Sequence, residues 1–295
     1  MKLKRNRIDL HVHTTASDGT DRPEVVVKKA CSLGLAAVAV TDHDTVDGVE
    51  EAMSAGINFH IEVVPGIEFS VESAGEMHIL GYFPHQCWKD SLDRISRILK
   101  QLQQRREIRN HQVLGKLNDA GFNLTMEEVK KEAGGKIISR LHIASVMVRK
   151  GYEPDISMVF NKHIGKGCDA YVPKEVLSPE EGIQIIQNAG GLPVLAHPFS
   201  LALELPALQE RIRALKSYGL AGIEAIYWEY SEIQRQHLLH IASENGLLVT
   251  GGSDYHGEYR SKSQLGTGAG DLWVDEILLQ NMKESMARAT HMRCR

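Results

Sequence analysis

The chain has 295 residues, of which 42% are hydrophobic and 24% are charged, as in an ordinary globular protein. Its formal net charge of −4 excludes a strongly basic surface for non-specific nucleic-acid binding. It does not exclude a phosphate substrate, because bound cations would dominate the charge of a site. The four cysteines form no C-x-x-C pair, which indicates a reducing compartment. The basic N-terminus lacks an apolar core, and no run of about 18 apolar residues occurs. We therefore expect a cytoplasmic protein with no signal peptide and no membrane span.

The first third of the chain alternates predicted strands and helices. We expect strands at residues 7–10, 36–41, 61–64 and 77–82, and helices at 24–33 and 46–55. This β-α-β-α-β order favours parallel strands joined by right-handed crossovers. Ligand-type side chains recur where the strands end, at His13, His43 and Glu68. In a TIM-like barrel that end carries the active face.

The strand pattern disappears from residue 89 to residue 168, where helices are expected at 92–120, 126–132, 141–150 and 156–163. We interpret this stretch as a helical insertion that caps the active site. The α/β pattern then resumes, with strands at 192–196, 222–227 and 247–251 and helices at 179–189, 206–218, 231–245 and 274–287. Seven strands favour a seven-stranded, TIM-like α/β barrel made by residues 1–88 and 169–290.

The polar residues at the predicted strand ends form a candidate metal-binding constellation. His11 and His13 lie two residues apart on a strand and therefore point to the same side, and Asp18 follows in a Ser-Asp-Gly turn. Imidazole and carboxylate ligands without thiolate suit Zn, Mn or Fe in multinuclear hydrolytic sites. The remaining members are His43, Glu68, His78, His142, His197, Asp254 and His256.

Five short motifs occur in a fixed order along the chain. They are H-x-H at 11–13, T-D-H-D at 41–44, G-x-E at 66–68, A-H-P at 196–198 and S-D-x-H at 253–256. As an ordered set they resemble the PHP (polymerase and histidinol phosphatase) family, over nearly the whole chain. The resemblance is strongest to single-domain phosphoesterases with a helical insertion, which include nucleoside 3',5'-bisphosphate and AMP phosphatases and a 5'–3' exoribonuclease. It implies a distorted (β/α)7 barrel with three divalent metal ions (Mn, Zn or Fe).

The resemblance also implies which residues hold each metal. The first ion would be held by His11, His13, Glu68 and Asp254, the second by Asp18, His43 and His256, and the third by Glu68, His78 and His142. Glu68 would bridge the first and third ions. His197 is expected to contact the substrate phosphate or to protonate the leaving oxygen.

Four further residues are candidates for substrate binding. Arg140 lies two residues before His142, and its guanidinium fork suits a phosphate, so it is also a catalytic candidate. Lys166 and Lys174 flank the return of the chain to the barrel and are weaker candidates. Trp228 follows the strand at 222–227, where the family leads us to expect a polar loop. Its ring could stack on a base or simply pack.

These features predict a metal-dependent phosphoesterase. It would hydrolyse a phosphomonoester of a nucleotide, such as a nucleoside 3',5'-bisphosphate or AMP, or a short 5'-phosphorylated RNA. A metal-bridging hydroxide would attack phosphorus in line, because metal coordination lowers the pKa of water to about 7. No stable protein partner is expected. The alternatives are a histidinol-phosphate phosphatase, a non-catalytic PHP module and a metal-dependent amidohydrolase. The filled ligand positions argue against the non-catalytic module.

Overall fold

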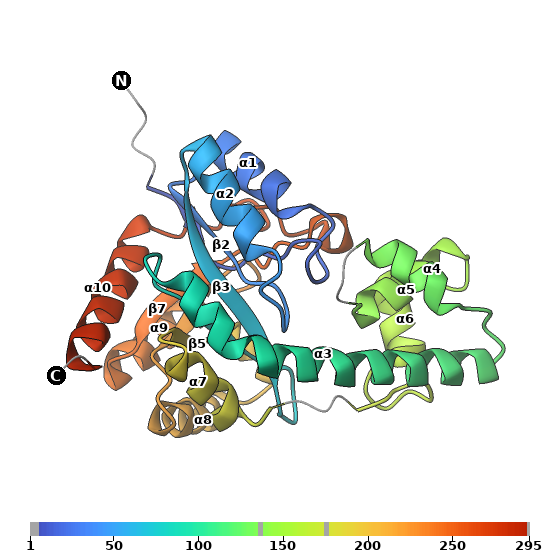
Figure 1. Cartoon of the computed structure of the whole chain (residues 1–295). Coiled ribbons are helices and arrows are strands. Elements are labelled where there is room, and N and C mark those ends of the chain that lie inside the picture. Colours follow the sequence, from blue (N-terminus) through green and yellow to red (C-terminus); the bar gives the residue numbers. More distant parts are fainter. Residues whose placement is uncertain (1–5, 135–137, 174–176, 294–295) are drawn as a thin grey trace.

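The computed structural model describes residues 6–134, 138–173 and 177–293 (Figure 1). Its strands form one sheet in chain order. The Leu10 amide, just after the first strand, donates to the carbonyl of Gly251 in the last one at 3.1 Å, so the sheet nearly closes into the predicted seven-stranded barrel. The strands are β1 (Ile8–Asp9), β2 (Ala37–Val40), β3 (Glu62–Val71), β4 (Met77–Tyr82), β5 (Leu192–Leu195), β6 (Gly222–Tyr227) and β7 (Leu248–Gly252).

Strand β4 departs from the predicted parallel order. The pairs among β1, β2 and β3 are parallel, as are those among β5, β6 and β7, but β4 is antiparallel to both β3 and β5. Only residues 72–76 separate β3 from β4, and this is too short for a crossover helix. Because β4 runs backwards, its beginning, with His78, lies at the edge where its neighbours end. The prediction of a parallel strand is therefore wrong, although His78 still reaches the expected face.

Helices cover the outer face of the sheet. Pro23 occupies the first turn of α1, and Ser178 and Ser231 cap α7 and α9 through capping boxes, so these helix starts follow from the sequence. A separate apolar cluster joins alternate strand residues to Leu279 and Met282 of α10. The outer helices are α1 (Pro23–Ser32), α2 (Val49–Phe59), α7 (Pro179–Asn188), α8 (Leu205–Ser217) and α9 (Glu232–Asn245), whereas α10 (Glu276–Arg293) packs against the strand residues that point to the other face.

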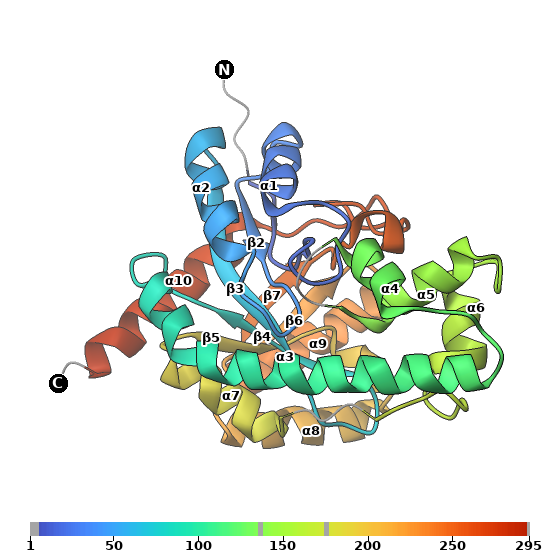
Figure 2. The ribbon, with the colours of Figure 1, turned by 45° about the vertical axis from the view of Figure 1, so that its right-hand side comes forward.

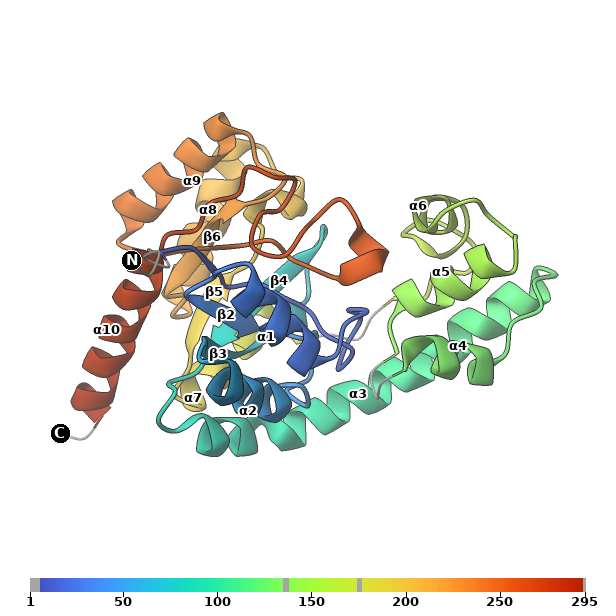
Figure 3. The same ribbon diagram turned by 90° about the horizontal axis from the view of Figure 1, so that it is seen from above.

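Between β4 and α7 the chain leaves the barrel along the long helix α3 (Trp88–Asp119). Figures 2 and 3 show α3 running beside the barrel and carrying three short helices at its far end. Those helices have an apolar core of their own, which includes Leu117, Val129 and Met147. They are α4 (Met126–Ala133), α5 (Arg140–Arg149) and α6 (Ile156–Val159), followed by one π-helical turn (Phe160–Ile164).

Polar contacts that join this helical segment to the barrel loops include an ion pair and a hydrogen bond near the edge where most strands end. Arg106 of α3 forms a buried ion pair with Asp44, which follows β2. Tyr259, in the short 3-10 helix η3 (Gly257–Arg260) after β7, donates to Glu132 of α4 at 3.3 Å. Within the described ranges, no helix combines the length and apolar character needed to cross a membrane.

Candidate metal centre

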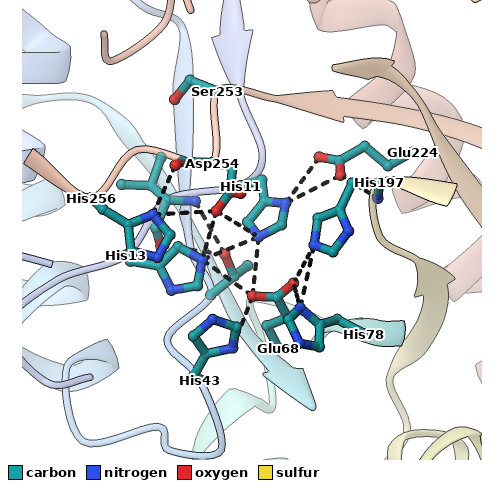
Figure 4. A network of polar contacts seen from close by, with 12 residues as sticks. His11, His13, His43, Glu68, His78, His197, Glu224, Ser253, Asp254 and His256 are labelled. Carbon is teal, nitrogen blue, oxygen red and sulfur yellow. Dashed lines mark hydrogen bonds and ion pairs between the residues drawn. The ribbon is translucent and has the colours of Figure 1, made fainter. Parts of the chain in front are cut away.

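Histidine and carboxylate side chains from all seven strands or from residues close to them converge at one edge of the barrel (Figure 4). β1 is followed by His11 and His13, β2 by His43, and β5 by His197, while Glu68 and His78 lie within β3 and β4. All are buried except His43, whose side chain is only 13% exposed. Asp18, Asp254 and His256 lie in the same cluster. The structure thus brings together most of the residues predicted to form the metal-binding site.

The ligand atoms fall into four overlapping groups, within each of which they all lie within 4.8 Å of one another. Glu68 belongs to two of the groups. Its Oε1 is 2.9 Å from His78 Nδ1 and 3.0 Å from His197 Nε2, and its Oε2 is 3.2 Å from His13 Nε2. The groups are His13, Asp18, His43 and His256; His11, Glu68 and His197; His11, His13 and Asp254; and His43, Glu68 and His78.

The buried carboxylates of this centre stay ionised. Burial alone would raise the pKa of Glu68, but the surrounding imidazoles, led by His43 and His11, hold it well below its ordinary value. Asp254 behaves alike, with Arg260 the main group that offsets burial. Conversely, burial would lower the pKa of His13, yet its hydrogen bonds to Asp254 and Glu68 raise that pKa to about 10. The ionised carboxylates of the centre therefore stabilise positive charge bound among them.

Unpartnered polar atoms show that these residues fit metal ions. Among the described residues, the buried ring nitrogens His13 Nδ1 and His43 Nδ1 make no hydrogen bond. Leaving such an atom unpaired costs about 1–3 kcal/mol. Imidazole nitrogen and carboxylate oxygen are good ligands for divalent transition metals. The donor set is therefore able to bind divalent cations.

His142 lies apart from these groups, none of which includes it within the part of the chain that the structure describes. Its Nδ1 accepts a hydrogen bond from the Ser139 amide at 3.1 Å, which closes a capping box at the start of α5. Its ring meets the Tyr259 ring edge-on, with centroids 5.7 Å apart. Helix capping thus engages Nδ1 of this histidine, whereas its buried Nε2 makes no hydrogen bond to a described residue, and its role as a metal ligand stays a prediction.

A cleft of about 960 Å³ opens over the centre, and His43, Glu68, His78 and His197 form its floor. The helical segment supplies part of the opposite wall, through Val148 and residues 154–157. Aromatic side chains, two cations and further carboxylates also line the cleft, and they include Phe199, Tyr227, Trp228, Tyr230, Tyr259, Arg260, Lys262, Glu76, Glu229 and Asp254. Of the residues predicted to bind substrate, His197 and Trp228 therefore face the cleft.

The other predicted substrate contacts are engaged elsewhere. Arg140 donates to the Ile164 carbonyl at 3.1 Å and lies over the Phe160 ring, 5.3 Å from its centroid. Lys166 donates to the Ala74 carbonyl at 2.7 Å. Neither Arg140 nor Lys166 is among the described residues that line the cleft. Lys174 lies outside the described residues.

Two residues near the centre were missed in the sequence. Glu224 of β6 is fully buried, lies 3.0 Å from His11 Nδ1 and accepts a hydrogen bond from the His197 amide at 2.8 Å. A single carboxylate inside the apolar segment Gly-Ile-Glu-Ala-Ile-Tyr was the available signal. Arg260 pairs with Asp254, which also accepts from the Tyr227 hydroxyl at 2.8 Å. No motif marks Arg260.

A barrel with a buried histidine–carboxylate centre at one edge defines the class of metal-dependent hydrolases. Comparison with known families narrows this class. The model of the PHP domain family matches residues 9–188, which is more than half of the chain. The chain therefore belongs to the PHP domain family, as its ordered motifs predicted.

Three similar proteins show the range of the family. The 5'-3' exoribonuclease of Haemophilus influenzae is 31% identical over 251 residues, 85% of this chain and 90% of that protein. The 3',5'-nucleoside bisphosphate phosphatase of Chromobacterium violaceum is 31% identical over 254 residues, 84% of this chain and 87% of that protein. A crystal structure described as a metal-dependent phosphoesterase from Bifidobacterium adolescentis matches with a TM-score of 0.82 and 29% identity, over 95% of this chain and 96% of that one. The present chain is accordingly an enzyme, a PHP-family phosphoesterase.

Proposed function

We propose that this enzyme hydrolyses a phosphomonoester of a nucleotide, such as a nucleoside 3',5'-bisphosphate or AMP, or a short 5'-phosphorylated RNA. The observation that carries the proposal is that one cleft joins the candidate metal centre to a wall of aromatic side chains. Its volume of about 960 Å³ lies at the upper end of the usual range for small-molecule sites, about 300–1,000 Å³. The exoribonuclease and the bisphosphate phosphatase described above support this choice.

We divide the residues of the four groups among three divalent ions by combining these groups with the contacts among Glu68, His78 and His197. We assign His11, His13 and Asp254 to one ion, and Asp18, His43 and His256 to another. Glu68, His78 and His197 would hold the third, with Glu68 shared with the first. In this assignment His197 takes the place that the family resemblance gave to His142, because its Nε2 lies 3.3 Å from His78 Nδ1 and 3.0 Å from Glu68 Oε1.

Bound divalent ions would supply an activated water at neutral pH and neutralise the charge that develops on the phosphoryl oxygens. The side chains of the protein have complementary roles. The Tyr227 hydroxyl and Arg260 hold one oxygen of Asp254, so that its other oxygen faces His13 Nε2 at 3.1 Å. Arg260 and Lys262 are cations of a lining that also carries the carboxylates of Glu76, Asp155 and Glu229, so bound ions would supply most of the positive charge that an anionic substrate needs. The aromatic wall offers a stacking surface for a base.

Phosphate release from a small panel of substrates tests the proposal. Protein stripped with a chelator and reloaded with Mn²⁺ would be assayed with a nucleoside 3',5'-bisphosphate, AMP, a short 5'-phosphorylated RNA and histidinol phosphate. We expect release from one or more of the nucleotides, and loss of that release in His43→Ala. Release from histidinol phosphate alone would indicate instead that the enzyme is a histidinol-phosphate phosphatase. Absence of phosphate release from all four, together with no release of nucleotides from the RNA, would contradict the proposal if Mn²⁺ is shown to be bound.

A further inference from the structure

Glu224 is a buried carboxylate placed between two candidate metal ligands (Figure 4). Its side chain is completely inaccessible to solvent. The Oε1 and Oε2 atoms lie 3.0 and 3.2 Å from His11 Nδ1, and Oε2 also accepts the backbone N–H of His197 at 2.8 Å. One carboxylate therefore contacts the ring of one candidate ligand and the backbone of another.

The contact with His11 fixes which ring nitrogen carries the proton. Carboxylate oxygens accept hydrogen bonds, so Nδ1 is the nitrogen that donates to Glu224. This leaves Nε2 facing the centre, 3.3 Å from Glu68 Oε2 and 3.6 Å from Asp254 Oδ1. Carboxylates hydrogen-bonded to the far nitrogen of a ligating histidine orient the ring and make it a better ligand.

The contact with His197 stabilises an unusual backbone. His197 follows β5 directly and has φ 26° and ψ 65°, in a region that residues other than glycine rarely adopt. Such a conformation costs of order 1–3 kcal/mol and persists only where its surroundings hold it. Glu224 binds its amide, and the Ser200 hydroxyl lies 2.8 Å from its Nδ1. The His197 ring then lies parallel to that of His11, with centroids 5.7 Å apart and planes 19° apart.

We propose that Glu224 is a positioning residue that sets His11 and His197 together, so that the Nε2 atoms of both face the shared carboxylate of Glu68. The proposal rests on the metal centre proposed above. Because His11 and His197 are assigned to different ions, Glu224 couples two parts of that centre through a single side chain.

Glu224→Gln tests the proposal, with Mn²⁺ affinity measured by electron paramagnetic resonance titration of chelator-treated protein. The amide oxygen of glutamine can accept, but its NH₂ group must face either the His11 or the His197 donor. Loss of such an outer partner typically weakens metal binding by about 10–100-fold, and we expect a loss in this range. Glu224→Asp keeps the charge but shortens the reach, so it should not restore affinity. Glu210→Gln, on the exposed face of α8, is the matched control for loss of one negative charge.

The outcomes separate this proposal from the function. If the wild type binds Mn²⁺ and Glu224→Gln binds it equally tightly, the positioning role is wrong while the metal centre stands. Wild-type Mn²⁺ affinity in Glu224→Asp would also overturn the positioning role, because a negative charge at this position would then be enough for metal binding. A wild type that binds no Mn²⁺ refutes both. Should Glu224→Gln fail to fold, ¹⁵N-histidine spectra of the Zn²⁺-loaded wild type decide. A proton on Nδ1 of His11 supports the role, and one on Nε2 refutes it.

Discussion

Replacing Glu68 with glutamine should abolish most of the stabilisation that metal ions give this protein. The carboxylate lies within 3.3 Å of ring nitrogens of five histidines, namely His11, His13, His43, His78 and His197. Glutamine has the same shape but carries no charge, and its NH₂ group is not a metal ligand. Loss of a residue that only hydrogen-bonds to a metal ligand weakens metal binding by ~10–100-fold. Glu68 is itself a candidate ligand and belongs to two of the four ligand groups, so its loss should weaken Mn²⁺ binding by about 100-fold or more.

The expected thermal effect follows from mass action. Free Mn²⁺ at 100 times its Kd stabilises the wild type by about 2.7 kcal/mol. After a 100-fold loss of affinity the same concentration equals the Kd, and the stabilisation falls to RT ln 2, about 0.4 kcal/mol. For a chain of this size 1 kcal/mol shifts the melting temperature by about 2 °C. For each ion that depends on Glu68, the contribution to the rise on adding Mn²⁺ should therefore fall from about 5 °C to about 1 °C.

Scanning fluorimetry of chelator-treated protein, with and without Mn²⁺, measures this difference directly. Glu210→Gln, which removes a negative charge from an exposed position, should keep the full rise. The metal-free melting temperature of each variant is recorded as well, so that a change in intrinsic stability is not mistaken for lost binding. An equal rise in Glu68→Gln and the wild type would refute the placement of Glu68 at the heart of the metal centre.

Three further outcomes follow from the same geometry. His197→Ala should lower the bound metal per chain by elemental analysis, whereas His142→Ala should not, and the opposite result would restore the ligand set implied by the family resemblance. Trp228→Ala should raise KM for a nucleotide by about 5–150-fold, the equivalent of ~1–3 kcal/mol of base stacking, but leave KM for glycerol phosphate unchanged. If both rise together, the ring does not bind a base. Because the pKa of His13 is raised to about 10, its imidazole is protonated near neutral pH in the metal-free site. Mn²⁺ must displace a proton from this ring in order to bind it. Mn²⁺ affinity should then increase from pH 6 to pH 9 with proton release seen by calorimetry in two buffers, and a flat profile would argue against it.

Strand ends could be located from the sequence because apolar runs and histidine motifs alternate in it. The direction of β4 could not, since a run of alternating residues looks the same in a parallel and an antiparallel strand. The feature that marks a hairpin is the short link at residues 72–76. Because the strand was expected only at 61–64, the link to the next strand looked longer than it is. The strand in fact continues to Val71, because its residues from Val63 onward are all buried. Glu68 therefore lies inside a strand and not in the loop after it.

The site shows the same limit at the level of single residues. His43 and Asp254 lie in motifs, so their positions could be inferred. His142 lies three residues after Ser139 and caps a helix through its Nδ1, whereas its buried Nε2 makes no hydrogen bond within the described part of the chain, so its predicted role as a metal ligand stays a prediction. Glu224 has no motif, and its role depends on contacts with His11 and His197, which are 213 and 27 residues away in the sequence. Such long-range partners are set by tertiary packing, which a sequence pattern does not contain.

The cleft is lined by residues from two parts of the chain, and we expect these parts to contribute differently to substrate specificity. Its floor comes from strand-end residues held by the barrel, whereas Val148 and residues 154–157 come from a helical segment with its own apolar core. We expect changes in that segment to reshape the wall without moving the floor, because the segment has its own apolar core and contacts the barrel loops through pairs such as Arg106 with Asp44 and Tyr259 with Glu132. Relatives of about 31% identity bear the names of an exoribonuclease and a bisphosphate phosphatase. We therefore expect the metal chemistry to be common to these enzymes and the choice of nucleotide to depend on the wall.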